Sequence, residues 1–395
     1  MIEKHDAKKL ASTVWHKPQH TFLLGCGTCP DRTICGGLQV RASVLSCMDF
    51  CCGEPKGCTI VCPQKSDYSM RVHEVEGFDL KNIKKRQLIH FPSVPRIMPL
   101  IYRSLPLAQT IPTDIVAIPF SEFSVRRGKY AFPRTRAELC GKFRLAPSTK
   151  IVLSGVENDR RVELWWGALG KSEVLAAMRE LGVLFVTTPN FSAIADVPRH
   201  DNMHSLKRIA LTWAELHDAH IPAAVHVNCR TDFDFIRFGE FLRMHDEIEA
   251  ISFEYTTGGA NEECGEFFTK SLCELAIKVS RPLTLVLRGG VRWISSLAPY
   301  YANISSLDTT ACMRTIKRQR AHVGSDGRPR WRHSPTRKGA PIDELLKHNM
   351  GAMEEHIRLL HSGLNVGVSR TRSAKVPSLK VKSEADDKTT QGSFL

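Results

Sequence analysis

The cysteines of this chain are concentrated in one short stretch near the N-terminus. Eight of the thirteen lie between positions 26 and 62, with glycine and proline among them. Thiolates are soft metal ligands, and glycine lets the backbone turn sharply so that several sulfurs face one centre. In a reducing compartment such a cluster favours metal binding over disulfides. The predicted ligands are Cys26, Cys29, Cys35, Cys47, Cys51, Cys52, Cys58 and Cys62.

The spacing of these cysteines favours iron over zinc. Zinc sites use paired Cys-x2-Cys or Cys-x2-4-His steps, but this stretch has one Cys-x2-Cys, and no histidine lies between Phe22 and Pro63. The run Cys58-x3-Cys62-Pro63 is similar to the end of a bacterial ferredoxin motif. We therefore predict an iron–sulfur centre, one or two 4Fe–4S clusters, with a structural zinc clip as the alternative. The division of the ligands between two centres stays open.

A second set of candidate residues follows apolar runs later in the chain. Glu254 directly follows the run 251–253 and is a candidate acid or base, together with Asp232 and His226. Arg288 is a candidate clamp for a phosphate or carboxylate. The glycine pairs offer open backbone amides for the same anion, and Asn228 lies two residues after His226. The predicted binding residues are Arg288, Gly289, Gly290, Gly258, Gly259 and Asn228.

Regular alternation of strands and helices must position this second set. Short β-branched runs occur at 114–119, 150–155, 183–188, 223–228, 250–254, 282–287 and 304–308. Amphipathic helical patterns lie between them at 171–181, 205–219, 233–245 and 262–279. Strands about 30 residues apart with helices between them indicate βαβ units and a parallel sheet. The pattern predicts a (β/α)₈ TIM-like barrel whose reactive residues lie at the carboxyl ends of the strands, with an open doubly wound sheet as the alternative.

The chain divides into five parts on composition. Residues 1–63 form an N-terminal helix and the cysteine-rich metal-binding segment, and 64–113 form an extended connector containing several prolines. The barrel spans 114–312. A basic extension, 313–362, ends in an amphipathic helix, and the Ser/Lys/Thr-rich tail 363–395 is predicted to be disordered.

Charge and hydropathy limit the partners. The net charge is +14, and the segment 313–338 carries nine Lys and Arg residues against one acid, Asp326. This excess indicates a nucleic-acid or nucleotide partner. Apolar runs are too short to cross a bilayer, and the first residues lack the apolar stretch of a secretory signal, so we expect a cytoplasmic protein without membrane contact.

The cysteine cluster, the barrel and the basic extension together favour an enzyme that acts on a nucleotide or nucleic acid. Base modification is one reaction that such an enzyme could catalyse. In general architecture the chain resembles base-exchanging transglycosylases, which combine a barrel, catalytic acids and a cysteine metal site. It departs from that family because its cysteines precede the barrel. The Cys-x3-Cys-x2-Cys motif of radical S-adenosylmethionine enzymes does not occur. In the enzyme hypothesis the basic segment holds phosphates, and Trp331 is available to stack on bases. The alternative function is a non-catalytic, metal-stapled nucleic-acid-binding protein.

Overall fold

A computed structural model describes residues 66–362 and three short pieces at 21–22, 32–35 and 39–40. Within the long stretch the description excludes Ser104, Ser124, 127–128, Ala131, 169–170, 194–198, 257–261 and Lys338. Seven of the eight predicted metal ligands (all but Cys35), the pair Gly258 and Gly259, and the tail 363–395 therefore lie outside the described residues.

Eight parallel strands form one sheet that nearly closes into a barrel. They are β3 (Ile97–Pro99), β4 (Ile115–Pro119), β7 (Lys150–Ser154), β8 (Val183–Thr187), β9 (Ala223–His226), β10 (Ala250–Glu254), β11 (Thr284–Arg288) and β12 (Asn303–Asp308). Neighbours in the sheet follow chain order, and β3 also pairs with β12. A parallel bridge between Leu100 and Ala117 joins the remaining edges. In an open doubly wound sheet the order of the strands changes direction in the middle of the sheet, whereas here it runs in one direction around the sheet. The predicted barrel-like fold is therefore confirmed.

All seven predicted runs are strands, and the eighth strand comes from the stretch expected to be a connector. Strand β3 has only three residues and ends on a proline. Proline at a strand end removes a ladder donor, yet the pairing continues because the next backbone N–H, that of Leu100, donates to the carbonyl of Asp308 at 2.7 Å. A strand this short has no periodicity to detect, and the prolines around it are typical of an irregular connector. The sequence therefore did not predict it.

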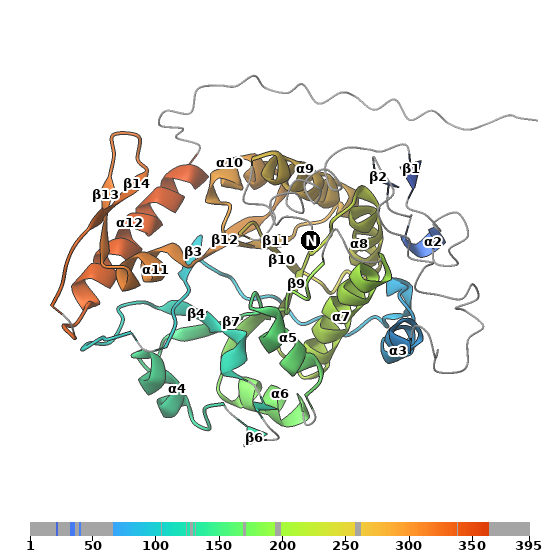
Figure 1. Cartoon of the computed structure of the whole chain (residues 1–395), viewed down its shortest axis with the longest axis horizontal. Helices are drawn as coiled ribbons and strands as arrows, with labels where there is room; N and C mark the ends of the chain where they lie inside the picture. Colours follow the sequence, from blue (N-terminus) through green and yellow to red (C-terminus); the bar gives the residue numbers. More distant parts are fainter. Residues whose placement is uncertain are drawn as a thin grey trace, which may run out of the picture.

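Helices surround the sheet (Figure 1). They are α3 (Ser66–Glu74), α4 (Arg136–Phe143), α5 (Asp159–Trp166), α6 (Lys171–Glu180), α7 (Arg199–Asp218), α8 (Asp232–Met244), α9 (Glu262–Val279), α10 (Ile294–Leu297), α11 (Thr310–Ile316) and α12 (Asp343–His361), with α2 (Arg32–Cys35) in a separate short piece. Two short antiparallel pairs belong to other sheets: β1 (Thr21–Phe22) with β2 (Gln39–Val40), and β5 (Val125–Arg126) with β6 (Lys129–Tyr130). Among the described helices, none has the length and apolar character needed to span a membrane.

Each strand contributes at least one apolar side chain to the barrel interior, and one from each strand is almost fully buried. These residues are Met98, Ala117, Val152, Phe185, Ala224, Ala250, Val286 and Leu307, each at most 2% exposed. They form a cluster separate from the larger core between sheet and helices. Because successive side chains on a strand alternate, the next inward positions lie one layer nearer the carboxyl end, where the polar residues are.

The amino end of the barrel is covered by the chain that precedes β3. Glu249, directly before β10, accepts from the backbone N–H of Phe91 at 2.6 Å, and buried Glu247 accepts from that of Arg86 at 2.8 Å. The Phe91 ring then packs on Phe185, with 4.7 Å between ring centroids. These contacts hold the preceding chain against the amino end of the barrel.

The basic segment contains an antiparallel hairpin that the sequence did not predict. Strand β13 (Gln319–Val323) pairs with β14 (Pro329–His333), and the pair lies against α12. In Figure 1 this hairpin and α12 occupy one end of the molecule, and α3 and α7 lie towards the other. Asn349 of α12 fixes the hairpin by accepting from the N–H of Ala321 at 2.9 Å and donating to the carbonyl of Gln319 at 2.8 Å.

Candidate active site

A cavity of about 310 Å³ opens at the carboxyl ends of the strands. Its walls come from β4, β7, β10 and β11, from the segments that follow β3, β7, β8 and β10, and from α5. The lining residues are Leu100, Tyr102, Pro119, Ser154, Val156, Glu157, Asn158, Arg161, Asn190, Glu254, Thr256 and Arg288. This end of a (β/α)₈ barrel is where active sites of such enzymes lie, and the volume suits a small ligand or a single base.

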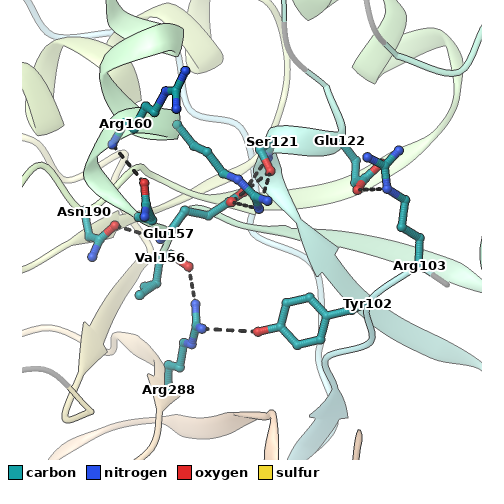
Figure 2. Close-up of polar contacts among 11 residues, drawn as sticks. Tyr102, Arg103, Ser121, Glu122, Val156, Glu157, Arg160, Asn190 and Arg288 are labelled. Atoms are coloured by element: carbon teal, nitrogen blue, oxygen red, sulfur yellow. Dashed lines mark hydrogen bonds and ion pairs between the residues drawn. The ribbon is translucent and has the colours of Figure 1, made fainter. Parts of the chain in front are cut away.

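Arg288, the last residue of β11, is fixed across the mouth (Figure 2). Its guanidinium donates through Nη1 to the carbonyl of Val156 and through Nη2 to the hydroxyl of Tyr102 at 3.5 Å. The Nε atom is buried and has no hydrogen-bond partner among the described residues. Burial raises the pKa of Tyr102, so its hydroxyl stays neutral. The pair can therefore offer a cation and a hydroxyl to an anionic group in the cavity.

Glu157 holds the wall opposite by accepting several hydrogen bonds. The Ser121 hydroxyl donates to its Oε2 at 2.8 Å (Figure 2). Arg161 donates to the same atom at 2.9 Å. The backbone N–H of Glu157 donates to Asn190 Oδ1 at 3.0 Å, which ties the loop after β7 to the loop after β8. Since its carboxylate is already occupied and only 6% exposed, Glu157 is suited to orient the wall rather than to move protons.

Glu254 is the second carboxylate of the mouth. It ends β10, lines the cavity and accepts a hydrogen bond from the Thr256 hydroxyl. Arg230, which follows β9, lies close enough to interact with it electrostatically. Burial lowers the pKa of Arg230 to about 10, and the charge of Glu254 opposes that decrease. The carboxylate is partly exposed at the cavity wall, so it can reach a ligand in the cavity, and this reach is the first requirement of acid–base chemistry.

His226 lies one layer beneath the cavity and is buried. Its backbone N–H donates to the Thr188 hydroxyl at 2.8 Å, and its Nδ1 lies 3.3 Å from the Ser252 hydroxyl. Burial lowers the pKa of His226 to about 3, and the nearby cations Arg230 and Arg288 lower it further in the same direction. The imidazole is therefore neutral near pH 7 and supports the floor of the mouth without contributing positive charge.

Two other predicted residues lie outside the cavity lining. Asn228 is buried and donates to the carbonyl of Phe191 at 2.7 Å, so it ties the loops after β8 and β9 together. Asp232 is exposed at the first position of α8, directly after the N-cap Thr231. An acid there interacts favourably with the helix dipole, which explains the residue without a catalytic role.

Gly289 and Gly290 make a turn that other residues cannot make. Both have left-handed backbone angles, φ +72° and +65°. A Cβ on Gly290 would lie 2.3 Å from the Tyr255 side chain, and one on Gly289 would lie 2.6 Å from that of Thr256. Neither glycine lines the cavity. The pair lets the chain after β11 pass closely over the end of β10, and it thereby places Arg288 beside the mouth.

Cys35, the one described member of the cysteine segment, contacts the barrel at a group of buried arginines. It is 3% exposed, and α2 lies against α8. Arg237 of α8 donates to the carbonyl of Ile34 at 3.5 Å, whereas its Nε and Nη2 are buried without hydrogen-bond partners in the described chain. Asp234 forms an ion pair with Arg199 at 1–3% side-chain exposure. The described residues contain no group of three metal-ligating side chains.

Two buried arginines, Arg199 and Arg237, lie beside Cys35. Burial lowers the pKa of Arg237, whereas the Asp234 carboxylate and Cys35 favour the charged forms of both guanidinium groups.

Sequence reasoning missed three residues of the mouth: Tyr102, Ser121 and Arg161. Tyr102 follows β3, which was not recognised as a strand. Ser121 lies in a short 3-10 turn after β4, and Arg161 lies one helical turn after Glu157, a spacing that allows an ion pair. That spacing was a readable signal for Arg161, whereas nothing in the sequence near Tyr102 marked it.

The comparison with known proteins adds no family to this description. No protein-family model matches the chain, and no characterised protein matches it either. The class that the fold and the mouth define is therefore a (β/α)-barrel protein with an arginine- and carboxylate-lined cavity at its carboxyl end.

Proposed function

We propose that this protein is an enzyme that acts on a nucleotide or nucleic acid at the barrel mouth, with base modification as the reaction class. One observation carries the proposal: the cavity combines a fixed cation, Arg288, with an ionisable carboxylate, Glu254, at the end of the barrel used for catalysis. The volume of about 310 Å³ accommodates one base, and a base within a duplex would have to leave the stack to enter it.

In this proposal the mouth residues divide the work between binding and proton transfer. Arg288 and Tyr102 hold a phosphate of the substrate, because a guanidinium and a hydroxyl match phosphate oxygens. Glu254 accepts a proton from the reacting group or water and returns it to the leaving group. Glu157 keeps Ser121 and Arg161 in place, and neutral His226 forms the floor.

We further propose that the cysteine segment binds metal: one or two 4Fe–4S clusters, with zinc as the alternative. Cys26, Cys29, Cys35, Cys47, Cys51, Cys52, Cys58 and Cys62 would hold it, and Arg199 and Arg237 would balance the charge near Cys35. A cluster would supply electron transfer, and zinc would supply a structural clip. A thiolate site of this kind requires a reducing compartment, so we place the protein in the cytoplasm.

The test is a comparison of nucleosides before and after exposure to the protein. Duplex DNA and bulk RNA are incubated with the anaerobically purified protein, digested, and analysed by mass spectrometry for altered nucleosides. We expect an altered nucleoside with the wild type and a loss of at least about 100-fold with Glu254→Gln, the typical contribution of a general acid or base. Glu173→Gln, an exposed acid on α6, is the matched control and should retain full activity.

A second candidate function is the non-catalytic, metal-stapled nucleic-acid-binding protein. The exposed basic hairpin β13–β14 favours it, because a binding surface of that kind needs no reactive mouth. The two functions differ in one outcome. The decisive case is protein that is folded, metal-loaded and able to bind duplex but leaves the nucleosides of every nucleic acid unaltered. That result would contradict the enzyme proposal and favour the binding protein.

A further inference from the structure

The β13–β14 hairpin is a two-stranded ribbon with two different faces. Cross-strand pairs place Arg320 opposite Arg332 and His322 opposite Arg330, and all four side chains are exposed. The residues between them alternate to the other face, where Ala321 is 3% exposed and Trp331 packs on the core. One face thus fixes the ribbon on α12, and the other presents three arginines and a histidine to solvent.

The outward face has little negative charge to balance it. Like charges directly opposite each other destabilise an antiparallel pair, yet Arg320 lies directly opposite Arg332 on this face. Among the described residues, Asp326 in the turn is the one acid that forms an ion pair there, with Arg330 at 3.5 Å. Arg332 and His322 have no carboxylate partner in the described part of the chain. This repulsion destabilises the ribbon when no ligand is bound. An anionic ligand would offset the repulsion by neutralising the positive charge.

The ribbon is also held in a fixed orientation. His348 of α12 accepts from Arg320 at its Nδ1, at 3.0 Å, and donates from Nε2 to the carbonyl of Ala321 at 2.8 Å. Asn349 holds the adjacent backbone, and Arg314 lies over the Trp331 ring, 5.4 Å from its centroid. Trp331 is therefore part of the inner face, and the stacking role expected for it is not supported by this placement. The cationic face is preorganised, so binding would require little reordering.

We propose that the outward face of the β13–β14 ribbon binds the sugar–phosphate backbone of a double-stranded nucleic acid. Planar guanidinium groups match phosphate oxygens in bidentate fashion, and a two-stranded antiparallel ribbon is narrow enough to enter the major groove of B-form DNA. The proposal builds on the nucleic-acid substrate proposed above and assigns the polymer to a surface separate from the mouth. Four basic side chains on one rigid ribbon suit a regular polyanion better than a single small anion.

The experiment measures binding of a 20-base-pair fluorescent DNA duplex by anisotropy at several salt concentrations. The full-length double variant Arg330→Gln/Arg332→Gln is compared with wild type and with Arg179→Gln/Arg243→Gln, which removes two exposed arginines from α6 and α8. We expect the ribbon variant to bind at least roughly tenfold more weakly. The slope of log K against log salt should decrease by about two, one for each lost phosphate contact. The control should bind as wild type does.

Further ligands separate the possible partners. Duplex RNA of the same sequence is the second nucleic acid, and binding that depends on the ribbon for either duplex supports the proposal and identifies the source. Heparin and vesicles of anionic phospholipid test for a general affinity for polyanions. Unchanged duplex binding by the ribbon variant would overturn the proposal. So would equal weakening in the α6/α8 control, or equally tight ribbon-dependent binding of heparin or vesicles.

The ribbon can fail independently of the mouth. Glu254→Gln should bind duplex with wild-type affinity, because Glu254 belongs to the cavity and not to the ribbon. The ribbon variant should keep wild-type affinity for a nucleoside 5′-monophosphate, which needs only the mouth. Unfolding midpoints check that both proteins are folded. An inactive mouth with ribbon-dependent duplex binding would leave this inference intact and remove the proposed enzyme.

Discussion

The barrel mouth and the β13–β14 ribbon both carry arginines, but they treat charge in opposite ways. At the mouth, Arg288 is fixed by Val156 and Tyr102, and the Glu157 carboxylate accepts from Ser121 and Arg161. On the ribbon, basic side chains lie opposite one another and face solvent. At the mouth, neighbouring groups hold the charged side chains in a cavity, whereas on the ribbon basic side chains lie next to one another in solvent.

This difference indicates two kinds of recognition. Paired and partly buried groups are preorganised to act on one small part of a ligand, where precise placement matters. Exposed cations act over a longer range and distinguish ligands chiefly by total charge, with strong dependence on salt. A polymer substrate would use both surfaces, and a free nucleotide would use the mouth alone.

The largest effect is expected where a buried charge supports the mouth. Asp234→Asn removes the carboxylate that pairs with Arg199 and accepts from the backbone N–H groups of Arg230 and Thr231. We expect the free energy of unfolding to fall by about 3–5 kcal/mol, because a buried guanidinium loses its partner. Chemical denaturation measures this. The control is Asp246→Asn, which breaks an exposed pair with Lys85 and should change stability by less than about 1 kcal/mol.

The next effect separates fixed charge from charge alone at the mouth. Arg288→Lys keeps the positive charge but cannot contact Val156 and Tyr102 together. We expect affinity for a nucleoside 5′-monophosphate, measured by calorimetry, to fall by roughly 10- to 100-fold. Duplex binding through the ribbon should change little. Equal affinity of Arg288→Lys and wild type for the monophosphate would show that the geometry of Arg288 is unimportant.

A smaller effect concerns pH and the floor of the mouth. The pKa of His226 is about 3 in the folded chain and near 6.5 when unfolded. Between these values the unfolded state binds a proton that the folded state does not, so stability falls as pH falls from about 6.5 towards 3. Thermal unfolding of His226→Gln should therefore show a weaker decline than wild type over pH 6.5 to 4. Parallel profiles would show that His226 is not buried and neutral.

The smallest effect comes from the ribbon and has opposite signs for stability and binding. Arg332→Thr removes the like-charge pair with Arg320 and introduces a residue that favours strands. We expect the chain to become more stable by up to about 1 kcal/mol, and duplex binding to weaken. Calorimetric unfolding and anisotropy measure the two. A variant that loses stability would contradict the view that the ribbon carries uncompensated charge.

The sequence predicted the barrel because its information is local and repeated. Seven β-branched runs about 30 residues apart identified seven strands, and Glu254 and Arg288 lie at the cavity because strand ends are readable in the sequence. Strand β3 was missed because three residues between prolines carry no period. The hairpin was missed because its strands alternate arginine with small or aromatic residues, a pattern that reads as a basic linker.

Other parts of the site depend on contacts that no sequence pattern specifies. Asp232 follows a strand in the chain, yet it begins α8 and is not among the residues that line the cavity. Gly289 and Gly290 were expected to bind phosphate, whereas their angles and the closeness of Tyr255 and Thr256 explain them as a turn. The lowered pKa of His226 arises from burial in the closed barrel, which only the three-dimensional arrangement determines.

The most direct test of the account measures altered nucleosides against duplex concentration for three proteins: wild type, Glu254→Gln and Arg330→Gln/Arg332→Gln. The account predicts that Glu254→Gln makes no altered nucleoside at any concentration although it binds the duplex. The ribbon variant should recover wild-type turnover once the duplex is concentrated enough to overcome its weaker binding. Wild-type turnover by Glu254→Gln would contradict the central claim that the barrel mouth is the reactive site.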